Sequence, residues 1–227
     1  MIWPDFAQAR DYALQRLEQE LDPALVYHSI AHTRDEVVPA VERLAIMQGM
    51  AGEELLLLLT AATYHDLGFI EQGHGHEWVS IRIAQEVLPG FGYNPGQILL
   101  ISGMIRATDP SHIPRTHLEA ILADADLDVL GCDEYLDRSL DLRRELEHEG
   151  QFMSDRQWYL HQLQFLRAHR YWTQSARVLR DAGVQKNISR LDLQLAKLQP
   201  LPKPVSYTHL TLPTTRQRCR SRWSAGH

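Results

Sequence analysis

The chain has 227 residues, which fits one domain with an appendage at roughly 100 to 200 residues per domain. Hydrophobic residues make up 44% and charged residues 23%, which excludes disordered and fibrous proteins, and a formal net charge of −6 disfavours a nucleic acid polymer as partner. No apolar run approaches the roughly 20 residues of a membrane span, and residues 1–5 lack the basic start of a secretory signal, so we expect a cytoplasmic protein without a membrane partner.

Apolar residues recur with helical spacing along most of the chain, and no run alternates with the period of a strand. We therefore predict an all-α fold, a single helical bundle of about eight to nine helices. Thr33 and Glu36 have the spacing of a capping box at the start of the second helix. The third helix is apolar nearly all round, which predicts a central position. The predicted helices cover residues 4–20, 33–49, 53–67, 77–88, 95–107, 116–130, 132–149, 154–168 and 173–199.

The dipeptide His65-Asp66 closes the third, all-apolar helix. Taken alone, such a dipeptide is more often a helix-terminal cap than a site. A buried carboxylate without a partner costs several kcal/mol, however, so at this position it is expected to be paired or bound to a metal. His28 and His32, at the start of the second helix, could supply a further histidine ligand.

Three acids, Asp124, Asp126 and Asp128, stand at alternate positions of an otherwise apolar helix. Alternate positions on a helix point to opposite sides, so at most some of these acids can face solvent. By its apolar neighbours Asp126 is predicted to be the most buried and to be the ligand. Asp124 is expected to bond a neighbouring helix or a ligand histidine from behind. The alternative is a partly exposed acidic helix.

Together these pieces give the order His, His-Asp, Asp, which resembles the HD superfamily of metal-dependent phosphohydrolases. The likeness covers most of the first 200 residues. It is carried by Tyr27-His28 through His32-Thr33, by residues 61–68, by Glu77 with Ser80, by residues 105–108 with His112, by residues 124–131 and by residues 171–191. The resemblance implies a helical fold with one metal held by His32, His65, Asp66 and Asp126.

Imidazole and carboxylate ligands suit a divalent transition metal such as Mn, Fe, Co, Ni or Zn. Such a metal can lower the pKa of a bound water and polarise a phosphoryl oxygen. Asp66 is therefore also assigned a catalytic role, and Glu77 and His76 are candidates for orienting the water or protonating the leaving group. An equally good interpretation of that pair is a solvated loop that leads into a helix. His112 could complete a second metal site with His76.

The resemblance implies a small phosphorylated substrate, a phosphomonoester or phosphodiester, with nucleotides the favoured class. Lysine is scarce, so arginine is expected to bind the phosphate. Arg34 and Arg106 lie nearest the predicted site, with His28 beside them, although a surface ion pair is the more common role for each of these arginines. No phosphate loop with a Gly-Lys-Ser/Thr ending and no dinucleotide-binding glycine turn occurs. The alternative function is a metal-containing ligand-binding or regulatory module without turnover, and a weaker one is a purely structural helical protein. The oligomeric state stays open.

The composition changes at Leu201, so we divide the chain into a phosphohydrolase domain, residues 1–200, and a tail, residues 201–227, that is non-native or disordered. Residues 205–214 resemble a translated sequencing adaptor, and residues 219–224 resemble its far end. The alternative is a natural basic tail, since residues 205–227 carry four arginines and no acid.

We predict that residues 205–227 are dispensable, because they lack apolar periodicity and so have no face to bury. A chain that ends at Pro204 should keep the melting temperature and the metal content of the full chain. Thermal unfolding and elemental analysis of the two chains check this. A large loss of either quantity would show that the segment is native and packed.

Overall fold

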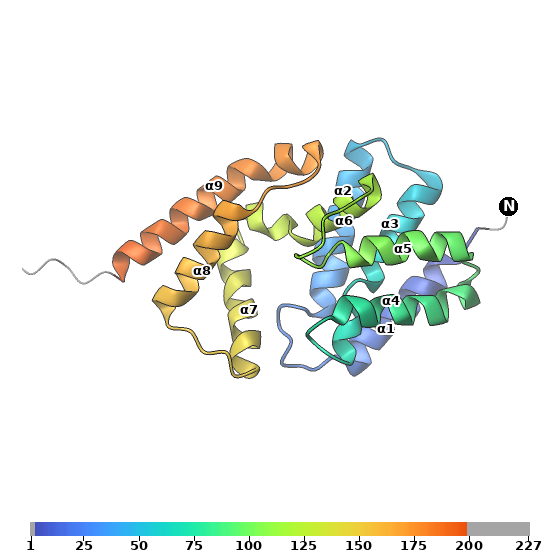
Figure 1. Cartoon of the computed structure of the whole chain (residues 1–227), viewed down its shortest axis with the longest axis horizontal. Helices are drawn as coiled ribbons and strands as arrows, with labels where there is room; N and C mark the ends of the chain where they lie inside the picture. The colour runs from blue at the N-terminus through green and yellow to red at the C-terminus, as the bar shows by residue number, and fades with distance from the viewer. Residues whose placement is uncertain (1–2, 199–227) are drawn as a thin grey trace, which may run out of the picture.

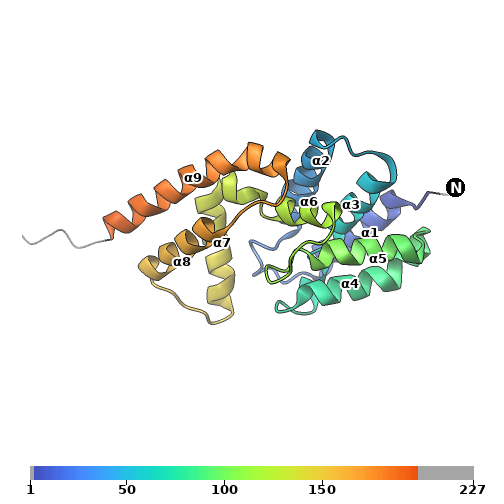
Figure 2. The same cartoon turned by 45° about the horizontal axis from the view of Figure 1, so that its top comes forward.

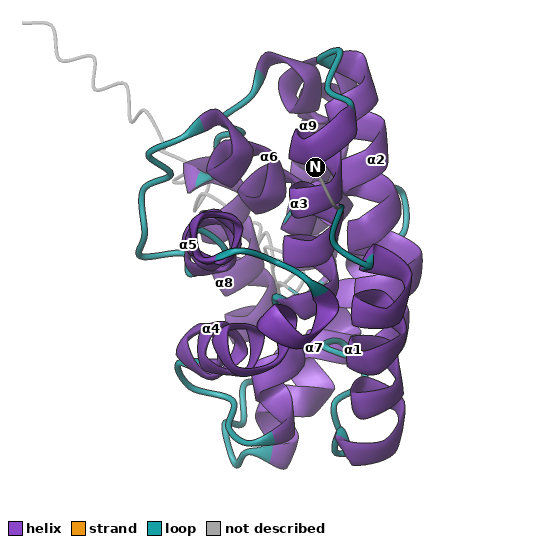
Figure 3. Ribbon diagram, turned by 90° about the vertical axis from the view of Figure 1, so that its right-hand side faces the viewer, coloured by secondary structure: helices purple, strands orange, loops and turns teal. Residues whose placement is uncertain are grey.

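The structure is a computed structural model that describes residues 3–198. This part contains helices and loops and no strand (Figure 3), so the predicted all-α fold is confirmed. The predicted tail lies outside the described residues. The α-helices are α1 Phe6–Glu20, α2 Val38–Met47, α3 Gly52–Tyr64, α4 His76–Val87, α5 Pro95–Arg106, α6 His117–Asp126, α7 Tyr135–His148, α8 Asp155–Ala168 and α9 Gln174–Lys197. A π-helix, η1 His32–Val37, and three 3-10 turns, η2 Leu67–Ile70, η3 Leu88–Phe91 and η4 Asp128–Gly131, complete the described part.

Polar side chains begin several helices by accepting from the free backbone N–H groups of the first turn. Asn94 and Ser154 form complete capping boxes for α5 and α8. The capping box predicted from Thr33 and Glu36 is wrong. The backbone is already helical at Ala31, so Thr33 lies inside a helix and has no free N–H group to cap.

The helices form two groups, with α1 to α5 on one side and α7 to α9 on the other (Figures 1 and 2). Helix α3 contacts α1, α2, α5 and α6, which confirms its central position. Its Leu58, Ala61 and Tyr64 are fully buried, and the Tyr64 hydroxyl donates to the Ala9 carbonyl over 2.9 Å. No helix among residues 3–198 is long and apolar enough to cross a lipid bilayer.

The two groups are joined where α9 crosses η4. The Gly183 backbone lies against Gly131, so closely that a Cβ on Gly183 would fall 1.9 Å from the Gly131 carbonyl oxygen. Beside this contact, Asp128 pairs with Arg180 from α9 and with Arg43 from α2, the latter over 2.6 Å. The crossing therefore combines close backbone approach with a shared carboxylate.

We predict that Gly183→Ala lowers the free energy of unfolding by about 2–3 kcal/mol, because the added methyl group can be accommodated only if α9 moves away from η4. Gly90→Ala is the matched control, since a Cβ at Gly90 meets nothing within 4 Å. That variant should be neutral or more stable by up to about 1 kcal/mol. Urea unfolding of the two variants measures both effects, and equal stabilities would contradict the close crossing.

Candidate metal centre

Three helix ends bring the four predicted ligands together. His32 begins η1, His65 and Asp66 follow the last residue of α3, and Asp126 ends α6. One donor atom from each of His32, His65 and Asp66 lies within 4.8 Å of the others. The Asp126 Oδ1 atom lies 3.2 Å from the His32 Nε2 atom and 3.3 Å from the His65 Nε2 atom. The predicted ligands therefore meet at one point.

Two buried polar atoms at this point, the His65 Nε2 atom and the Asp66 Oδ2 atom, have no hydrogen-bond partner within the described residues. The Nδ1 atom of His65 lies 2.7 Å from the Ala62 carbonyl oxygen, so it carries a proton and leaves Nε2 as a lone pair in the neutral ring. That Nε2 atom lies 3.2 Å from the Asp66 Oδ2 atom. Both atoms are buried and have no hydrogen-bond partner within the described residues. A cation between them would satisfy both, so the residues fit a metal.

The pKa values of these residues also indicate that the cluster needs added positive charge. Burial lowers the pKa of His32, but hydrogen bonds to Asp126 and Glu36 outweigh burial and raise this pKa to about 9. Burial also lowers the pKa of His65, and the charge of Asp66 raises it well above its ordinary value. For Asp66, burial raises the pKa, whereas the charge of His65 brings it well below the usual range. The cluster is therefore stable only with added positive charge, from protons or from a metal ion.

The turn after Asp66 is held against α4. The Gly68 N–H donates to the Ser80 hydroxyl over 2.7 Å, and that hydroxyl donates to the His65 carbonyl over 2.6 Å. A Cβ on Gly68 would lie 2.0 Å from the His76 carbonyl oxygen, so this position admits only glycine without movement. Through these contacts the start of α4 is fixed beside the metal centre.

This packing places the two predicted proton-transfer residues at the centre. The His76 Nε2 atom lies 3.3 Å from the Asp66 Oδ1 atom and 3.6 Å from the Glu77 Oε1 atom. The other ring nitrogen of His76 lies 3.0 Å from the Gly73 carbonyl oxygen and so donates to it. Burial lowers the pKa of His76, but its hydrogen bond to Asp66 outweighs burial and raises the pKa.

A cavity of about 270 Å³, which we call the central cavity, opens onto these residues. Its polar side includes His28, His32, Asp66, His76, Glu77 and Asp126. Its opposite side is largely apolar and comes from η4, α7 and α8, with Leu127, Val129, Leu130, Tyr135, Leu142 and Phe165. A ligand would therefore have its reacting group at the metal and its remainder against an apolar wall.

His28 lines the central cavity as expected of a substrate-binding residue. Its Nδ1 atom lies 2.7 Å from the buried Glu145 carboxylate, which also accepts from the backbone N–H groups of Tyr27 and His28. The His28 ring stacks on Phe69 at 4.3 Å between ring centroids. Glu145, from α7, thus ties the loop before η1 to the other group of helices.

The structure does not bring Arg34, Arg106 and His112 into the central cavity. Arg34 pairs with Asp35 at the surface, over 2.7 Å. The Arg106 guanidinium lies 4.2 Å from the centre of the Trp78 ring and donates to His112, which lines a neighbouring cavity. His112 does not line the central cavity with His76, and the second metal pair of these two residues stays a prediction.

Sequence reasoning missed Arg138, the one arginine among residues 3–198 that lines the central cavity. It lies over the Tyr27 ring at 4.7 Å and pairs with Glu36 over 2.9 Å and with Asp141 over 2.9 Å. Glu36 in turn accepts from the His32 Nδ1 atom over 2.9 Å. One feature of the sequence, the four-residue spacing of His32 and Glu36 on one helix face, indicates that Glu36 can bond His32. No local pattern marks Arg138.

The prediction that Asp126 is the most buried acid is wrong. Asp124 is 1% exposed, whereas the Asp126 side chain is 19% exposed and opens into the central cavity. Helix α6 ends at Asp126, so the residues expected to cover it no longer follow on the same helix. Asp124 accepts from the backbone N–H groups of Trp172 and Thr173, over 2.8 and 2.7 Å, and from the Thr173 hydroxyl. It fastens the start of α9 and bonds no ligand histidine.

Comparison with solved structures gives one match with the same fold. It is the crystal structure of a predicted HD superfamily hydrolase from an uncultured Thermotogales bacterium, with a TM-score of 0.58 and 19% sequence identity. The alignment covers 86% of this chain and 94% of that protein. The expected HD-type helical fold is confirmed. No family model and no curated protein matches the chain.

Two neighbouring acids should respond differently to the loss of charge. We predict that Asp126→Asn weakens metal binding by at least about 100-fold, because a ligand carboxylate is lost, and that Asp124→Asn leaves the affinity within about threefold. Asp124→Asn should instead lower the free energy of unfolding by about 1–3 kcal/mol, since donors at the start of α9 lose a charged acceptor. Metal titration and urea unfolding of both variants decide this. Metal loss in Asp124→Asn alone would reverse the assignment.

Proposed function

We propose that this protein is a metal-dependent phosphohydrolase that cleaves a small phosphomonoester or phosphodiester. The observation that carries the proposal is the buried pair formed by the His65 Nε2 and Asp66 Oδ2 atoms. Neither has a hydrogen-bond partner in the described part of the chain, and His32 and Asp126 converge on the same point at the end of a cavity. The solved protein with the same fold is described as a predicted hydrolase, which supports this class.

The ligand set is open, with imidazole nitrogens and carboxylate oxygens, and suits a divalent transition metal. Such a metal, held by His32, His65, Asp66 and Asp126, would supply an activated water and polarise a phosphoryl oxygen. Asp66 serves twice, because its Oδ2 atom faces the ligands and its Oδ1 atom faces His76. It therefore links metal binding to the orientation of His76.

His76 and Glu77 are the residues we assign to proton transfer. Burial lowers the pKa of His76, but the hydrogen bond to Asp66 outweighs burial and raises this pKa, which favours the protonated ring. From this position it can donate that proton to a leaving oxygen. Glu77 lies beside it with 9% exposure, lines the same cavity and can accept a proton from an attacking water. Glu145 orients His28, which can contact a substrate phosphoryl group.

One observation favours the second candidate, a metal-containing binding module without turnover. In the described part of the chain, Arg138 is the only arginine of the central cavity, and it donates to Glu36, Asp141 and the Tyr27 carbonyl. A phosphoryl group would therefore rely on the metal and on histidines. The two candidates differ in one result, since the module binds phosphate esters without cleaving them.

Metal binding and reaction should depend on the same ligand residues. We predict that the reconstituted protein holds about one equivalent of a divalent transition metal and hydrolyses at least one member of a panel of nucleotides and aryl phosphates. Asp66→Ala should lose the metal and lower kcat/KM by at least about 1000-fold, because it removes a ligand and the partner of His76. Elemental analysis and phosphate release measure the two effects.

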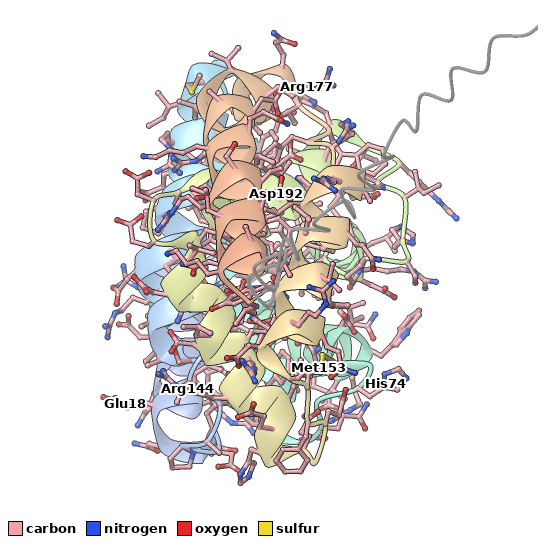
Figure 4. All side chains as sticks on the ribbon, turned by 90° about the vertical axis from the view of Figure 1, so that its left-hand side faces the viewer. Glu18, His74, Arg144, Met153, Arg177 and Asp192 are labelled. Carbon is pink, nitrogen blue, oxygen red and sulfur yellow. The ribbon has the colours of Figure 1, made fainter. Side chains whose placement is uncertain are left out.

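Asp192→Ala is the matched control. Figure 4 shows Asp192 along α9, and it pairs only with Arg167 at the surface, over 3.1 Å. That variant should keep the metal and the activity. Less than about a tenth of an equivalent of metal in the wild-type protein would rule out the proposed function. Full metal without hydrolysis of any ester would select the binding module.

A further inference from the structure

A second cavity, of about 420 Å³, adjoins the central cavity. It lies between the loop after α5, the end of α8 and the segment that leads into α9. We call it the arginine cavity, after Arg170 and Arg177 in its wall. Figure 4 shows Arg177 near the start of α9, at the opposite end of the view from His74. His74 belongs to a different hollow, which shares only Asp109 and Pro110 with the arginine cavity.

The charge of the arginine cavity differs from that of its neighbours. The central cavity has Asp66, Glu77 and Asp126 against a single arginine. The hollow that contains His74 has four carboxylates, from Glu77, Asp109, Glu145 and Glu149, and no arginine. The arginine cavity has two arginines and one carboxylate, Asp109, which accepts from the Ser111 N–H over 2.8 Å. In a chain of net charge −6, this local excess of positive charge stands out.

Backbone carbonyls hold the Arg170 and Arg177 side chains in place without neutralising their positive charge. Arg170 donates to the carbonyls of Arg167 and His169, and Arg177 donates to the carbonyls of Tyr171 and Trp172. Neither lies within ion-pairing distance of a carboxylate among residues 3–198. Backbone carbonyls orient a guanidinium without neutralising it, so both side chains can still pair with an anion.

Three large aromatic side chains, Phe165, Tyr171 and Trp172, also line the arginine cavity. Phe165 and Trp172 are 38% and 46% exposed, and Tyr171 lies behind them in contact with the His169 ring, at 4.5 Å between ring centroids. Burial and the charge of Arg170 lower the pKa of His169 to about 4, so this ring is neutral near pH 7. The positive charge therefore comes from the arginines, and the aromatic faces offer a stacking surface beside them.

The two cavities meet at a shared wall. Thr108, Pro110, Leu127 and Phe165 line both of them. Thr108 and Pro110 belong to the loop after α5, while Leu127 follows α6 and Phe165 lies on α8. A ligand that starts at the metal centre and follows the apolar wall of the central cavity arrives at this boundary. Beyond it lie the two unpaired arginines.

We propose that the arginine cavity binds a second anionic group of the substrate, a phosphate or a carboxylate, at the end remote from the scissile phosphate. The inference rests on the proposed function. It assigns a substrate class, an elongated molecule with an anion at each end and an apolar or aromatic middle. Arg170 and Arg177 pair with the remote anion, and Trp172 and Phe165 contact the part that precedes it.

The experiment uses the full chain, reconstituted with Mn²⁺, and alkanediol bisphosphates of increasing chain length. Each bisphosphate is compared with the alkyl monophosphate of the same length. In the wild-type protein, the ratio of kcat/KM values should peak at the length that spans both cavities. Arg170→Gln should lower this peak by about 10- to 100-fold, the effect of losing one charged hydrogen-bond donor to an anion.

Arg167→Gln is the matched control, because Arg167 lies in the last turn of α8, three residues before Arg170, carries the same charge and pairs with Asp192 outside the cavity. Its ratio should equal that of the wild-type protein. Since Arg170 also caps α8, Trp172→Glu is a second test, in which an exposed side chain is replaced by a carboxylate. It should keep the melting temperature and lower the same ratio. A ratio that does not change with length, or an equal loss in Arg167→Gln, would overturn the inference.

The second anion site can be tested separately from the proposed hydrolysis. If no ester is cleaved, titration calorimetry of the bisphosphates with the Mn²⁺-loaded protein tests the arginine cavity directly. Tighter binding of the bisphosphate than of the monophosphate, with that preference lost in Arg170→Gln, supports the second anion site without turnover. Equal affinities of the two ligands would reject it.

Discussion

The rest of the structure is arranged around two imidazoles and two carboxylates that face one another at one side of the central cavity. His65 is fully buried, and its Nδ1 proton is committed to the Ala62 carbonyl, so the ring can present only a lone pair or an added proton to Asp66. Two buried carboxylates repel each other unless positive charge lies between them. This requirement explains why so many contacts fix the end of α3. Glycine at position 68, the Ser80 hydroxyl and the start of α4 all hold that turn in place.

Contacts between the two groups of helices also help to hold the candidate metal ligands in position. Glu36 bonds the ligand His32 and also pairs with Arg138 from α7, so the ligand geometry depends on where α7 lies. Glu145 from α7 bonds the backbone of the loop that precedes η1. On the far side, Asp128 and the Gly131–Gly183 crossing hold α9. The metal centre is therefore not a property of α3 alone, since residues of α7 and α9 limit how far its ligands can move.

Local patterns in the sequence predicted the helices, which depend on spacing within one segment, whereas the set of four converging ligands came from the resemblance to the HD superfamily. The errors arise where a distant residue determines the outcome. Asp124 is buried because Thr173, 49 residues away, donates to it. Thr33 and Glu36 have the spacing of a cap, but the chain is already helical before them and Glu36 turns toward Arg138. Arg106 lies close to the site in sequence, yet it is held over Trp78.

The candidate metal ligands and the apolar wall of the central cavity come from different helices. This separation indicates how the substrate could change without loss of the metal centre. The metal ligands come from η1, the end of α3 and the end of α6, whereas the apolar wall comes mainly from η4, α7 and α8. Substitutions at Leu142 or Phe165 can reshape that wall without contacting a ligand. In the proposed function, the reaction and the choice of substrate would thus depend on different elements, so one helical scaffold could retain its metal chemistry while its specificity varies.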